Sequence, residues 1–311
     1  MEYFIAHYPN DPKYWKISAD MVDGVLMSQK NLHTKAGKPT RLMRKIEEKG
    51  AHEVLEIPKN IPFMLDSGAY QYIGPEWEEL PITPEEILEI YRKLKVDIGV
   101  HLDWPIVKGL SKKQINKRYK TTIENAEITY ELMQKERYNG LQIIAVTQGD
   151  SPSMYRKCAE RFIELGYKFI GIGGLALLSR FCTNYDEIFA RIKAVTNVAK
   201  HYKDVKVHLF GIGNINILSN VLGDGIISFD NATPTMAAIK GDLILFNPRY
   251  RRFNIIKNPE RADNEIPCGC VACNKYGKKL LKRGKREWNF ARAVHNYVHY
   301  RVALANHMVC K

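Results

Sequence analysis

The alternation of short apolar runs with longer amphipathic stretches restricts the fold of this chain most. Eight runs rich in Ile, Val and Phe recur between residues 3 and 229, and several are apolar on both faces, as strands of a covered parallel sheet are. The predicted strands are residues 3–7, 24–28, 61–65, 98–102, 142–146, 169–173, 205–210 and 225–229. This pattern predicts an α/β fold, either an open doubly wound sheet or a closed (β/α)8 TIM barrel. Eight strand–helix units favour the barrel.

The stretches between these runs predict helices. One begins with Thr83 as N-cap, Pro84 at the first position and acidic residues in the first turn. The others are predicted at residues 111–134, 151–165, 185–200 and 215–222.

The positive charge of the chain is concentrated near its end. The whole chain has 47 Lys and Arg against 34 Asp and Glu, a net charge of +13. Residues 240–311 hold 16 Lys and Arg and 5 Asp and Glu, so they carry +11 of that charge. This asymmetry indicates a basic surface that binds phosphate or acidic lipid. The same residues contain a cysteine cluster, described below, which predicts zinc binding. We therefore predict a barrel domain, residues 1–246, and a basic zinc-binding subdomain, residues 247–311, whose final helix packs on the barrel.

Polar and glycine-rich segments follow most of the predicted strands. Asp66, Asp103 and Asp230 each stand at such a strand end, which in a barrel would bring them to one rim. Alternatively, each Asp caps the following helix. Facing carboxylates suit chemistry at an anomeric carbon, where one attacks C1′ and another transfers protons. Tyr70 and Phe210 are candidates to sandwich a flat base, or else they pack in the core.

A cysteine cluster predicts a metal site in the C-terminal part. Cys268, Cys270 and Cys273 are followed after 21 residues by His295. Three thiolates and an imidazole make a closed tetrahedral zinc site, and a closed site is structural. His299 is one helical turn beyond His295, so spacing alone does not choose between them. Cysteines this close favour metal ligation in a reducing compartment over disulfides.

The N-terminus lacks a basic, apolar leader, and no run reaches the roughly 20 apolar residues of a membrane span. We therefore expect a cytoplasmic protein with no membrane partner.

Basic residues surround the cysteine cluster. A solvated helix face would explain them, but beside a zinc module we expect phosphate contacts, which position a nucleic acid without reading its sequence. The candidates are Arg249, Arg251, Arg252, Lys282, Arg283, Lys285 and Arg286.

Six segments between about residue 60 and residue 300 are specific as a set. They are residues 66–71 (DSGAYQ), Gln148-Gly149, 172–176 (IGGLA), 208–213 (HLFGIG), Phe229-Asp230 and the cysteine–histidine site. Together, and in this order, they resemble the tRNA-guanine transglycosylase superfamily. The resemblance implies a (β/α)8 barrel with a zinc-binding insertion near its C-terminal end.

The resemblance also implies catalytic roles. Asp230 would be the nucleophile and Asp66 the general acid/base. Asp103 would read the donor edge of the purine, and Ser67 is a further candidate for substrate binding.

The remaining implied roles concern the base and the metal. Gln148 and the backbone of Gly173 and Gly174 would bind the carbonyl oxygen of the purine, while Tyr70 and Phe210 would stack on it. His295 is the preferred zinc ligand because His295-Asn296 with Tyr300 is similar to the family's ending.

One branch of the superfamily is more similar than the others. Residues 147–155 (TQGDSPSMY), 164–167 (ELGY) and 171–176 (GIGGLA) resemble the DpdA-type enzymes of bacteria and phages, which exchange guanine in DNA for a 7-deazaguanine. Bacterial tRNA enzymes have an arginine-bearing segment after the nucleophile, and this segment is missing after Thr235. The chain also ends soon after the predicted helix that contains His295. We therefore predict a DNA-guanine transglycosylase, in a bacterial or phage-infected cytoplasm, that inserts the 7-cyano base.

Two alternatives are a tRNA-guanine transglycosylase and a non-catalytic nucleic-acid-binding subunit. The expected partners are DNA, or tRNA in the alternative, the free 7-deazaguanine base, and either a second copy of the chain or a helper protein. The expected cofactor is structural Zn²⁺.

Overall fold

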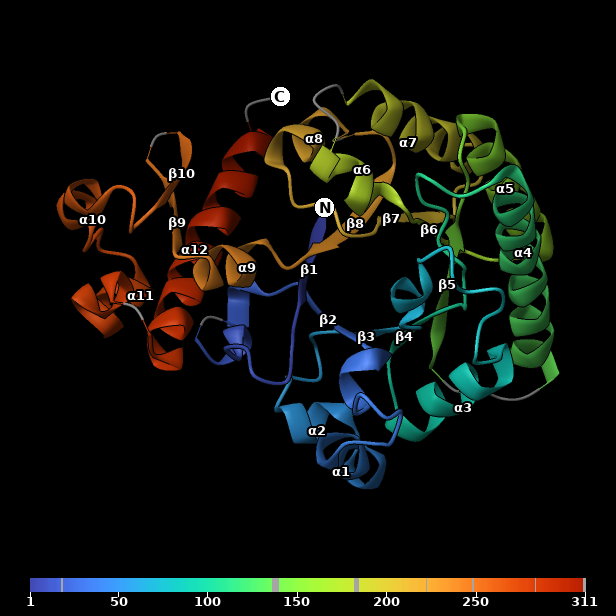
Figure 1. The fold of residues 1–311 in the computed structure, drawn as a ribbon, viewed down its shortest axis with the longest axis horizontal. Helices are drawn as coiled ribbons and strands as arrows, with labels where there is room; N and C mark the ends of the chain where they lie inside the picture. The colour runs from blue at the N-terminus through green and yellow to red at the C-terminus, as the bar shows by residue number, and fades with distance from the viewer. Residues whose placement is uncertain are drawn as a thin grey trace. The chain divides into compact units, whose positions relative to one another are not determined.

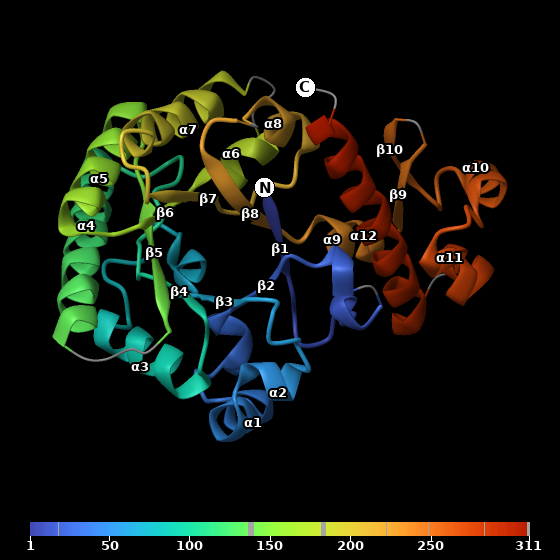
Figure 2. The same cartoon turned by 180° about the vertical axis from the view of Figure 1, so that it is seen from behind.

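The eight predicted strands close into a parallel barrel, which confirms the (β/α)8 prediction. In this computed structural model each strand pairs with the next in chain order, and β8 pairs with β1 (Figures 1 and 2). The strands are β1 (Glu2–Ala6), β2 (Gly24–Ser28), β3 (Phe63–Asp66), β4 (Ile98–Val100), β5 (Gln142–Thr147), β6 (Phe169–Ile172), β7 (Lys206–Leu209) and β8 (Ile226–Asn231). The structure describes residues 1–17, 19–135, 140–181, 185–221, 223–247, 249–282 and 284–309.

Alternate residues of the strands fill the barrel interior. Phe4, Leu26 and Met64 belong to one buried apolar cluster drawn from several strands. Their chain neighbours Tyr3 and Val25, whose side chains point to the opposite face, are also buried. This two-sided burial explains why the runs are apolar throughout. Because all strands run parallel, their carboxyl ends share one rim.

Helices follow the strands along the chain, and the long helices of the barrel unit lie outside the ring that the strands form (Figure 1). They are η1 (Tyr14–Lys16), η2 (Ala19–Met21), η3 (Gln29–Leu32), α1 (Arg41–Lys49), α2 (Ala51–Leu55), η4 (Ala69–Tyr72), α3 (Pro84–Leu94), α4 (Lys112–Lys135), α5 (Pro152–Leu165), α6 (Leu175–Phe181), α7 (Asp186–Ala199) and α8 (Ile215–Asn220). Helix α3 begins as predicted: Thr83 Oγ1 accepts from the Glu86 N–H, and the Glu86 carboxylate accepts from the Thr83 N–H. Among the described residues, no helix combines the length and apolarity needed to cross a membrane.

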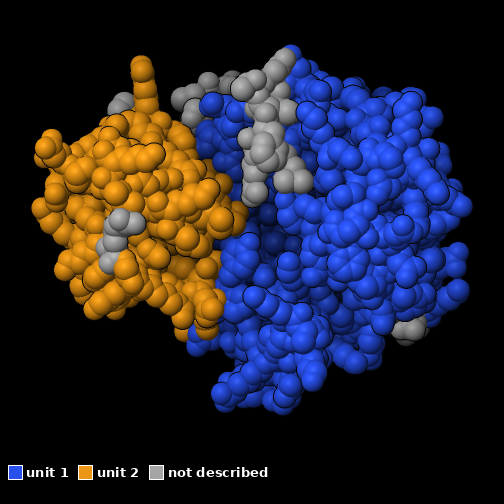
Figure 3. All heavy atoms as spheres, in the orientation of Figure 1, with its two compact units in different colours: residues 1–9, 23–217, 221–231 blue, residues 10–22, 218–220, 232–311 orange. Residues whose placement is uncertain are grey.

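The chain divides into two compact units (Figure 3). Unit 1, residues 1–9, 23–217 and 221–231, contains the barrel; unit 2 consists of residues 10–22, 218–220 and 232–311. Its later elements are α9 (Thr233–Ile239), β9 (Asp242–Phe246), β10 (Tyr250–Asn254), α10 (Pro259–Glu265), α11 (Val271–Tyr276), η5 (Gly277–Leu281) and α12 (Arg286–Val309). This division differs from the predicted one at residues 246 and 247.

The packing of β9 explains why unit 2 begins before residue 247. It pairs antiparallel with β10, and Leu243 and Phe253 of this pair share a core with the tail. The side chain of Asn296 in α12 accepts from the Ile244 N–H at 2.8 Å and donates to the Asp242 carbonyl at 2.9 Å. Residues 242–246 therefore fold with the tail, while the packing of the final helix on the barrel stays a prediction.

A buried arginine of α4 joins the loops that follow β3 and β4. The Arg118 guanidinium donates to the carbonyl oxygens of Ile73 (2.9 Å), Gly74 (2.6 Å) and Pro105 (2.8 Å). Its Cζ lies 4.9 Å from the ring centroid of Trp104, and only 1% of Arg118 is exposed. Because burying a charge is costly without such partners, these contacts fix both loops.

Replacing this arginine should destabilise the barrel. In Arg118→Met three carbonyls lose a charged donor, so the free energy of unfolding should fall by about 2–4 kcal/mol, measured by denaturant titration. Arg156→Met, which removes an exposed partner of Glu160 on α5, is the control and should cost less than about 0.5 kcal/mol. Equal small losses in both variants would contradict the role of Arg118.

Candidate active site and metal-binding cluster

One cavity at the carboxyl rim of the barrel collects every site residue predicted in this unit. Its empty volume, counting the open mouth, is about 770 Å³. The predicted residues that line it are Asp66, Ser67, Tyr70, Asp103, Gln148, Gly173, Gly174, Phe210 and Asp230. They come from the ends of the six strands β3 to β8, on the rim where barrel enzymes carry their chemistry.

Asp66, the last residue of β3, is held through one carboxylate oxygen. Its Oδ1 accepts from Ser28 Oγ and from the Gly68 N–H, both at 2.7 Å. Ser28 is opposite Asp66 in the β2–β3 register, and Gly68 has a φ of +73°, which favours glycine. Burial raises the pKa of Asp66 to about 6, and the charge of Asp230 adds to the rise. Asp66 can therefore exchange a proton near neutral pH.

Asp230 of β8 is held in the same way. Its Oδ1 accepts from the Gly211 N–H at 2.9 Å and lies 3.3 Å from His208 Nε2. His208 Nδ1 lies 2.8 Å from Ser228 Oγ, and both side chains are fully buried. With the proton on Nε2, His208 donates to Asp230 and accepts from Ser228. The chain of contacts fixes the rotation of the carboxylate.

Asp103 and Gln148 form a hydrogen-bonded pair in the cavity wall. Gln148 Nε2 donates to Asp103 Oδ2 at 2.7 Å, while Gln148 Oε1 accepts from the Ile106 N–H at 3.3 Å. The Ile106 N–H thus fixes which end of the amide faces Asp103. Burial raises the pKa of Asp103 to about 7, and the charge of Asp66 contributes.

Two glycines bring the backbone close to this pair. Gly174 has a φ of +73°, and a Cβ there would lie 2.9 Å from Tyr155 Oη and 3.0 Å from Gln148 Oε1. A Cβ on Gly173 would collide with Gln148 Nε2. Tyr155 also donates to the Gly173 carbonyl at 2.8 Å. Only glycine at both positions lets the peptide groups form this wall.

Two aromatic rings complete the cavity. Tyr70 is 50% exposed, and Phe210 is half-buried with its ring against the backbone of Gly171. The Phe210 and His208 ring centroids are 4.4 Å apart. Flat rings at a cavity surface suit stacking on a planar base.

Three buried or half-buried residues of this site were not selected from the sequence: Ser28, His208 and Ser228. Ser228 was a polar residue inside an apolar strand run, Ser28 ended such a run, and His208 began the HLFGIG segment without a role assigned to it. Such a residue serves a core hydrogen bond as often as a catalytic group, so the signal does not discriminate.

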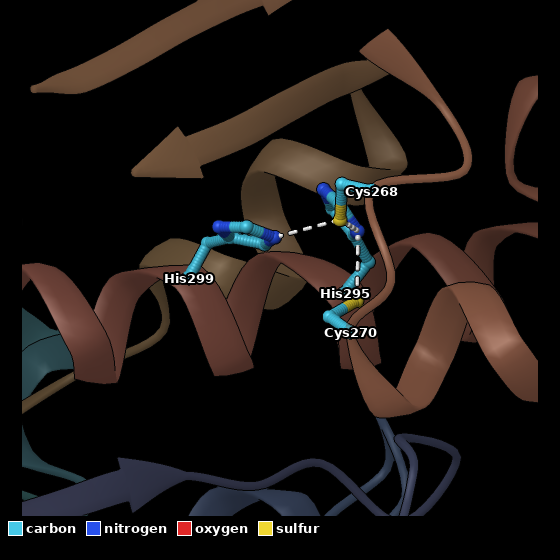
Figure 4. Close-up of side chains that lie close together, drawn as sticks. All are labelled: Cys268, Cys270, His295 and His299. Atoms are coloured by element: carbon cyan, nitrogen blue, oxygen red, sulfur yellow. Dashed lines mark hydrogen bonds between the residues drawn. The ribbon is translucent and has the colours of Figure 1, made fainter. Parts of the chain in front are cut away.

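Unit 2 contains a group of thiols and imidazoles that could hold a metal ion. The ligand atoms of Cys268, Cys270, His295 and His299 all lie within 4.8 Å of one another. Both histidines project from α12 toward the cysteine loop (Figure 4).

His295 lies closest to the full set of sulfurs. Its Nδ1 is 3.4 Å from Cys270 Sγ, 3.5 Å from Cys273 Sγ and 4.0 Å from Cys268 Sγ. The sulfurs of Cys268 and Cys273 are 3.6 Å apart. His299 Nε2 is 3.1 Å from Cys268 Sγ. The four predicted ligands are therefore together, and His299 is beside them.

Two of the predicted phosphate-binding residues already have carboxylate partners. Arg251 makes two bonds to Glu265, at 3.0 and 2.8 Å, and Arg252 makes two bonds to Asp242, at 2.9 and 2.7 Å. A charge count cannot show such pairing, which reduces the attraction of these arginines for phosphate.

Three of the other predicted basic residues lie near aromatic rings. The Nζ atoms of Lys282 and Lys285 are 5.9 and 5.3 Å from the Trp288 ring centroid, and Arg286 Cζ is 5.6 Å from that of Phe290. Arg249 is exposed. Arg283 lies outside the described residues.

A family model described as queuine tRNA-ribosyltransferase matches residues 16–307. The chain belongs to this family. The predicted superfamily is thereby confirmed, and the barrel cavity and the cysteine–histidine cluster both lie within the matched region.

Curated relatives of this family member cover much of its length. The tRNA-guanine(15) transglycosylase of Methanococcus aeolicus is 30% identical over 254 residues, and that of Methanocaldococcus jannaschii is 28% identical over 297 residues. These matches cover 80% and 93% of this chain but 37% and 42% of the relatives. The chain thus spans well under half the length of the relatives it matches.

The raised pKa of Asp103 in this family member predicts a pH-dependent stability. Burial lifts that pKa from 3.8 to about 7, so the stability from holding the proton is complete below pH 3.8 and is lost as the pH rises through 7. Asp103→Asn cannot ionise, so it should match the wild type near pH 4 and exceed it at pH 8 by about 2–4 kcal/mol.

Denaturant titrations at both pH values measure this difference. Glu48→Gln, at an exposed position, is the control for removing one acidic group. The same pH dependence in Asp103→Asn as in the wild type would refute the prediction.

Proposed function

We propose that the chain is a guanine transglycosylase that exchanges guanine in tRNA for a 7-deazaguanine base. The observation that carries the proposal is the placement of Asp66 and Asp230 in one cavity, each held through Oδ1. In the described part of the chain, neither Oδ2 has a hydrogen-bond partner. One oxygen of each carboxylate is therefore available to a substrate.

In the first half of the reaction, Asp230 attacks C1′ of the target nucleotide. The target is extruded from its stack to reach the cavity, which costs a few kcal/mol. As the C1′–N9 bond breaks, guanine leaves with the bonding electrons and takes a proton from Asp66. The product is a sugar joined to the Asp230 carboxylate, with Asp66 ionised.

In the second half, a 7-deazaguanine enters and gives its N9 proton to Asp66. Its N9 attacks C1′, and the bond from C1′ to Asp230 breaks. Asp66 ends protonated, as it began, and two inversions give net retention. A pKa of about 6 supports this double role, because both protonation states are accessible near neutral pH.

The cavity wall offers contacts for the base. Asp103 would accept from the donor edge of the purine. Gln148 gives one amide hydrogen to Asp103 and keeps the other for the carbonyl oxygen, near the peptide groups of Gly173 and Gly174. A carboxylate and an amide in one wall can thus bind both edges of guanine and of its 7-deaza analogue.

The names of the relatives support tRNA as the polymer, since those from both organisms are tRNA-guanine(15) transglycosylases. The DNA prediction rests on the resemblance of residues 147–155 and 171–176 to the DpdA type. A non-catalytic subunit would need neither Asp66 nor Asp230 in a shared cavity. Because the chain spans under half of the relatives' length, the polymer is best decided by direct assay.

Labelled guanine and labelled 7-cyano-7-deazaguanine, each offered with bulk tRNA and with plasmid DNA, provide that assay. We expect label to enter tRNA and a covalent adduct to form at Asp230. Asp230→Asn should form no adduct, and Asp66→Asn should slow exchange by about 10²–10⁴-fold. Asp204→Asn, at an exposed position, is the control.

Each other outcome has a distinct meaning. Label in DNA alone would overturn the tRNA proposal in favour of DNA exchange. Incorporation into neither polymer would favour the binding subunit. Normal exchange by Asp230→Asn would overturn the mechanism.

We also propose that Cys268, Cys270, Cys273 and His295 hold a structural Zn²⁺. In a regular tetrahedron with Zn–S of about 2.3 Å and Zn–N of about 2.05 Å, sulfurs lie about 3.8 Å apart and sulfur lies about 3.6 Å from nitrogen. The distances here, 3.6 Å and 3.4–4.0 Å, fit that geometry. Four protein ligands close the site, so the ion would stabilise unit 2 without joining the chemistry.

The purified chain should therefore contain about one zinc per molecule. Chelation should lower its melting temperature, because metal binding to a site absent from the unfolded chain is folding free energy. Cys270→Ser should lose the zinc, whereas Cys158→Ala, which alters a buried thiol of α5, should keep it. An unchanged melting curve after complete zinc removal would refute the structural role.

For the nucleic acid we propose contacts from Lys282, Lys285 and Arg286, whose cationic groups lie beside Trp288 and Phe290. Cations beside half-buried rings at the surface suit phosphate and base contacts together. Thiol ligation of zinc accords with the cytoplasmic location expected from the sequence.

A further inference from the structure

We propose that His299 is a positioning residue that donates a hydrogen bond to the Cys268 thiolate, and that it is not a metal ligand. The inference rests on the zinc site proposed above and assigns a role to a residue that ligand spacing alone cannot distinguish from His295. The observations concern the two ring nitrogens of His299 and the exposure of the sulfur it contacts.

The tautomer of His299 is fixed by the backbone. The N–H of Phe246, the last residue of β9, donates to His299 Nδ1 at 3.0 Å. A neutral imidazole carries one hydrogen, so with Nδ1 as acceptor the hydrogen is on Nε2. That nitrogen lies 3.1 Å from Cys268 Sγ (Figure 4). A nitrogen that carries hydrogen has no lone pair for a metal, so it donates to the sulfur.

A second contact of the same kind fixes the helix against the strand. Asn296, one turn before His299 on α12, accepts from the Ile244 N–H at 2.8 Å. Asn296 and His299 thus accept hydrogen bonds from the backbone N–H groups of residues 244 and 246 of β9. The acceptor role of His299 Nδ1 is therefore part of how α12 docks on β9, and it leaves only Nε2 for the cysteines.

The ring nitrogens of His295 are used the other way round from those of His299. Its Nδ1 faces the three sulfurs, while its Nε2 is buried with no hydrogen-bond partner among the described residues. Metal-ligating histidines usually have the second nitrogen held by an outer partner. Here the outer hydrogen bond goes to a thiolate ligand, Cys268, and His299 supplies it.

Cys268 is the ligand that most needs this bond. Cys273 is buried and Cys270 half-buried, but Cys268 is exposed. A hydrogen bond to a thiolate withdraws electron density from sulfur and opposes attack by protons or competing metal binders. His299 therefore slows loss of the metal from its most accessible side.

The 311-residue chain loaded with cobalt(II) or zinc tests this role. His299→Asn keeps an oxygen in place of Nδ1 for the Phe246 N–H but is too short to reach Cys268. We expect one metal per chain and an unchanged visible spectrum for tetrahedral cobalt with three sulfurs and one nitrogen. Transfer of the metal to a chromophoric chelator should be about 10–100-fold faster than in the wild type.

Two variants complete the design. His295→Asn should lose the tetrahedral cobalt spectrum, because it removes a ligand. Asn296→Ala breaks the neighbouring contact between α12 and β9 without touching sulfur, so its release rate should stay near that of the wild type.

Three results would overturn the inference. These are loss of the tetrahedral spectrum in His299→Asn but not in His295→Asn, an unchanged release rate in His299→Asn, or equally fast release from Asn296→Ala. A wild-type chain that binds no cobalt or zinc would instead refute the zinc proposal itself, which separates the two failures.

Discussion

The pairing of β1 with β8 is the interaction on which the site depends. In this register Phe4 lies opposite Asp230, and the bonds between the two strands close the sheet on itself. Asp66 stands on β3 and Asp230 on β8, far apart in the chain. In an open sheet of the same strands they would stand several strands apart. Closure brings them to one cavity, where the charge of one affects the pKa of the other.

Much of the fold and cavity follows from the sequence because both depend on local patterns. A strand buried on both faces must be apolar throughout, so its end shows as the first polar or glycine residue. In a parallel barrel all such ends share a rim, and Asp66, Asp103 and Asp230 could be grouped on that basis. The start of α3 was predictable for a similar reason, since Thr83 and Glu86 cap each other within four residues.

The features of the site and fold that the sequence did not predict depend on contacts between residues far apart in the chain. Ser28 reaches Asp66 only because of the β2–β3 register, and His208 reaches Asp230 only because β7 and β8 pair. Residues 10–22 belong to unit 2 through contacts such as the bond from Tyr297 Oη to the Met21 carbonyl at 2.6 Å. Nothing near these residues in the chain indicates their partners. Spacing could not choose between His295 and His299 as the fourth metal ligand for the same reason. The group that distinguishes them is the N–H of Phe246, which donates to His299 Nδ1.

Arg118 links two parts of the cavity wall that would otherwise move separately. Tyr70 precedes the carbonyls of Ile73 and Gly74 in the loop after β3, and Asp103 precedes that of Pro105 in the loop after β4. One guanidinium binds all three carbonyls. A displacement of one loop would therefore be passed to the other, so the positions of Tyr70 and Asp103 would change together. If the cavity binds a base as proposed, its tolerance for a bulkier substituent and its selectivity at the hydrogen-bonding edge would be one mechanical property, which selection or engineering would alter together.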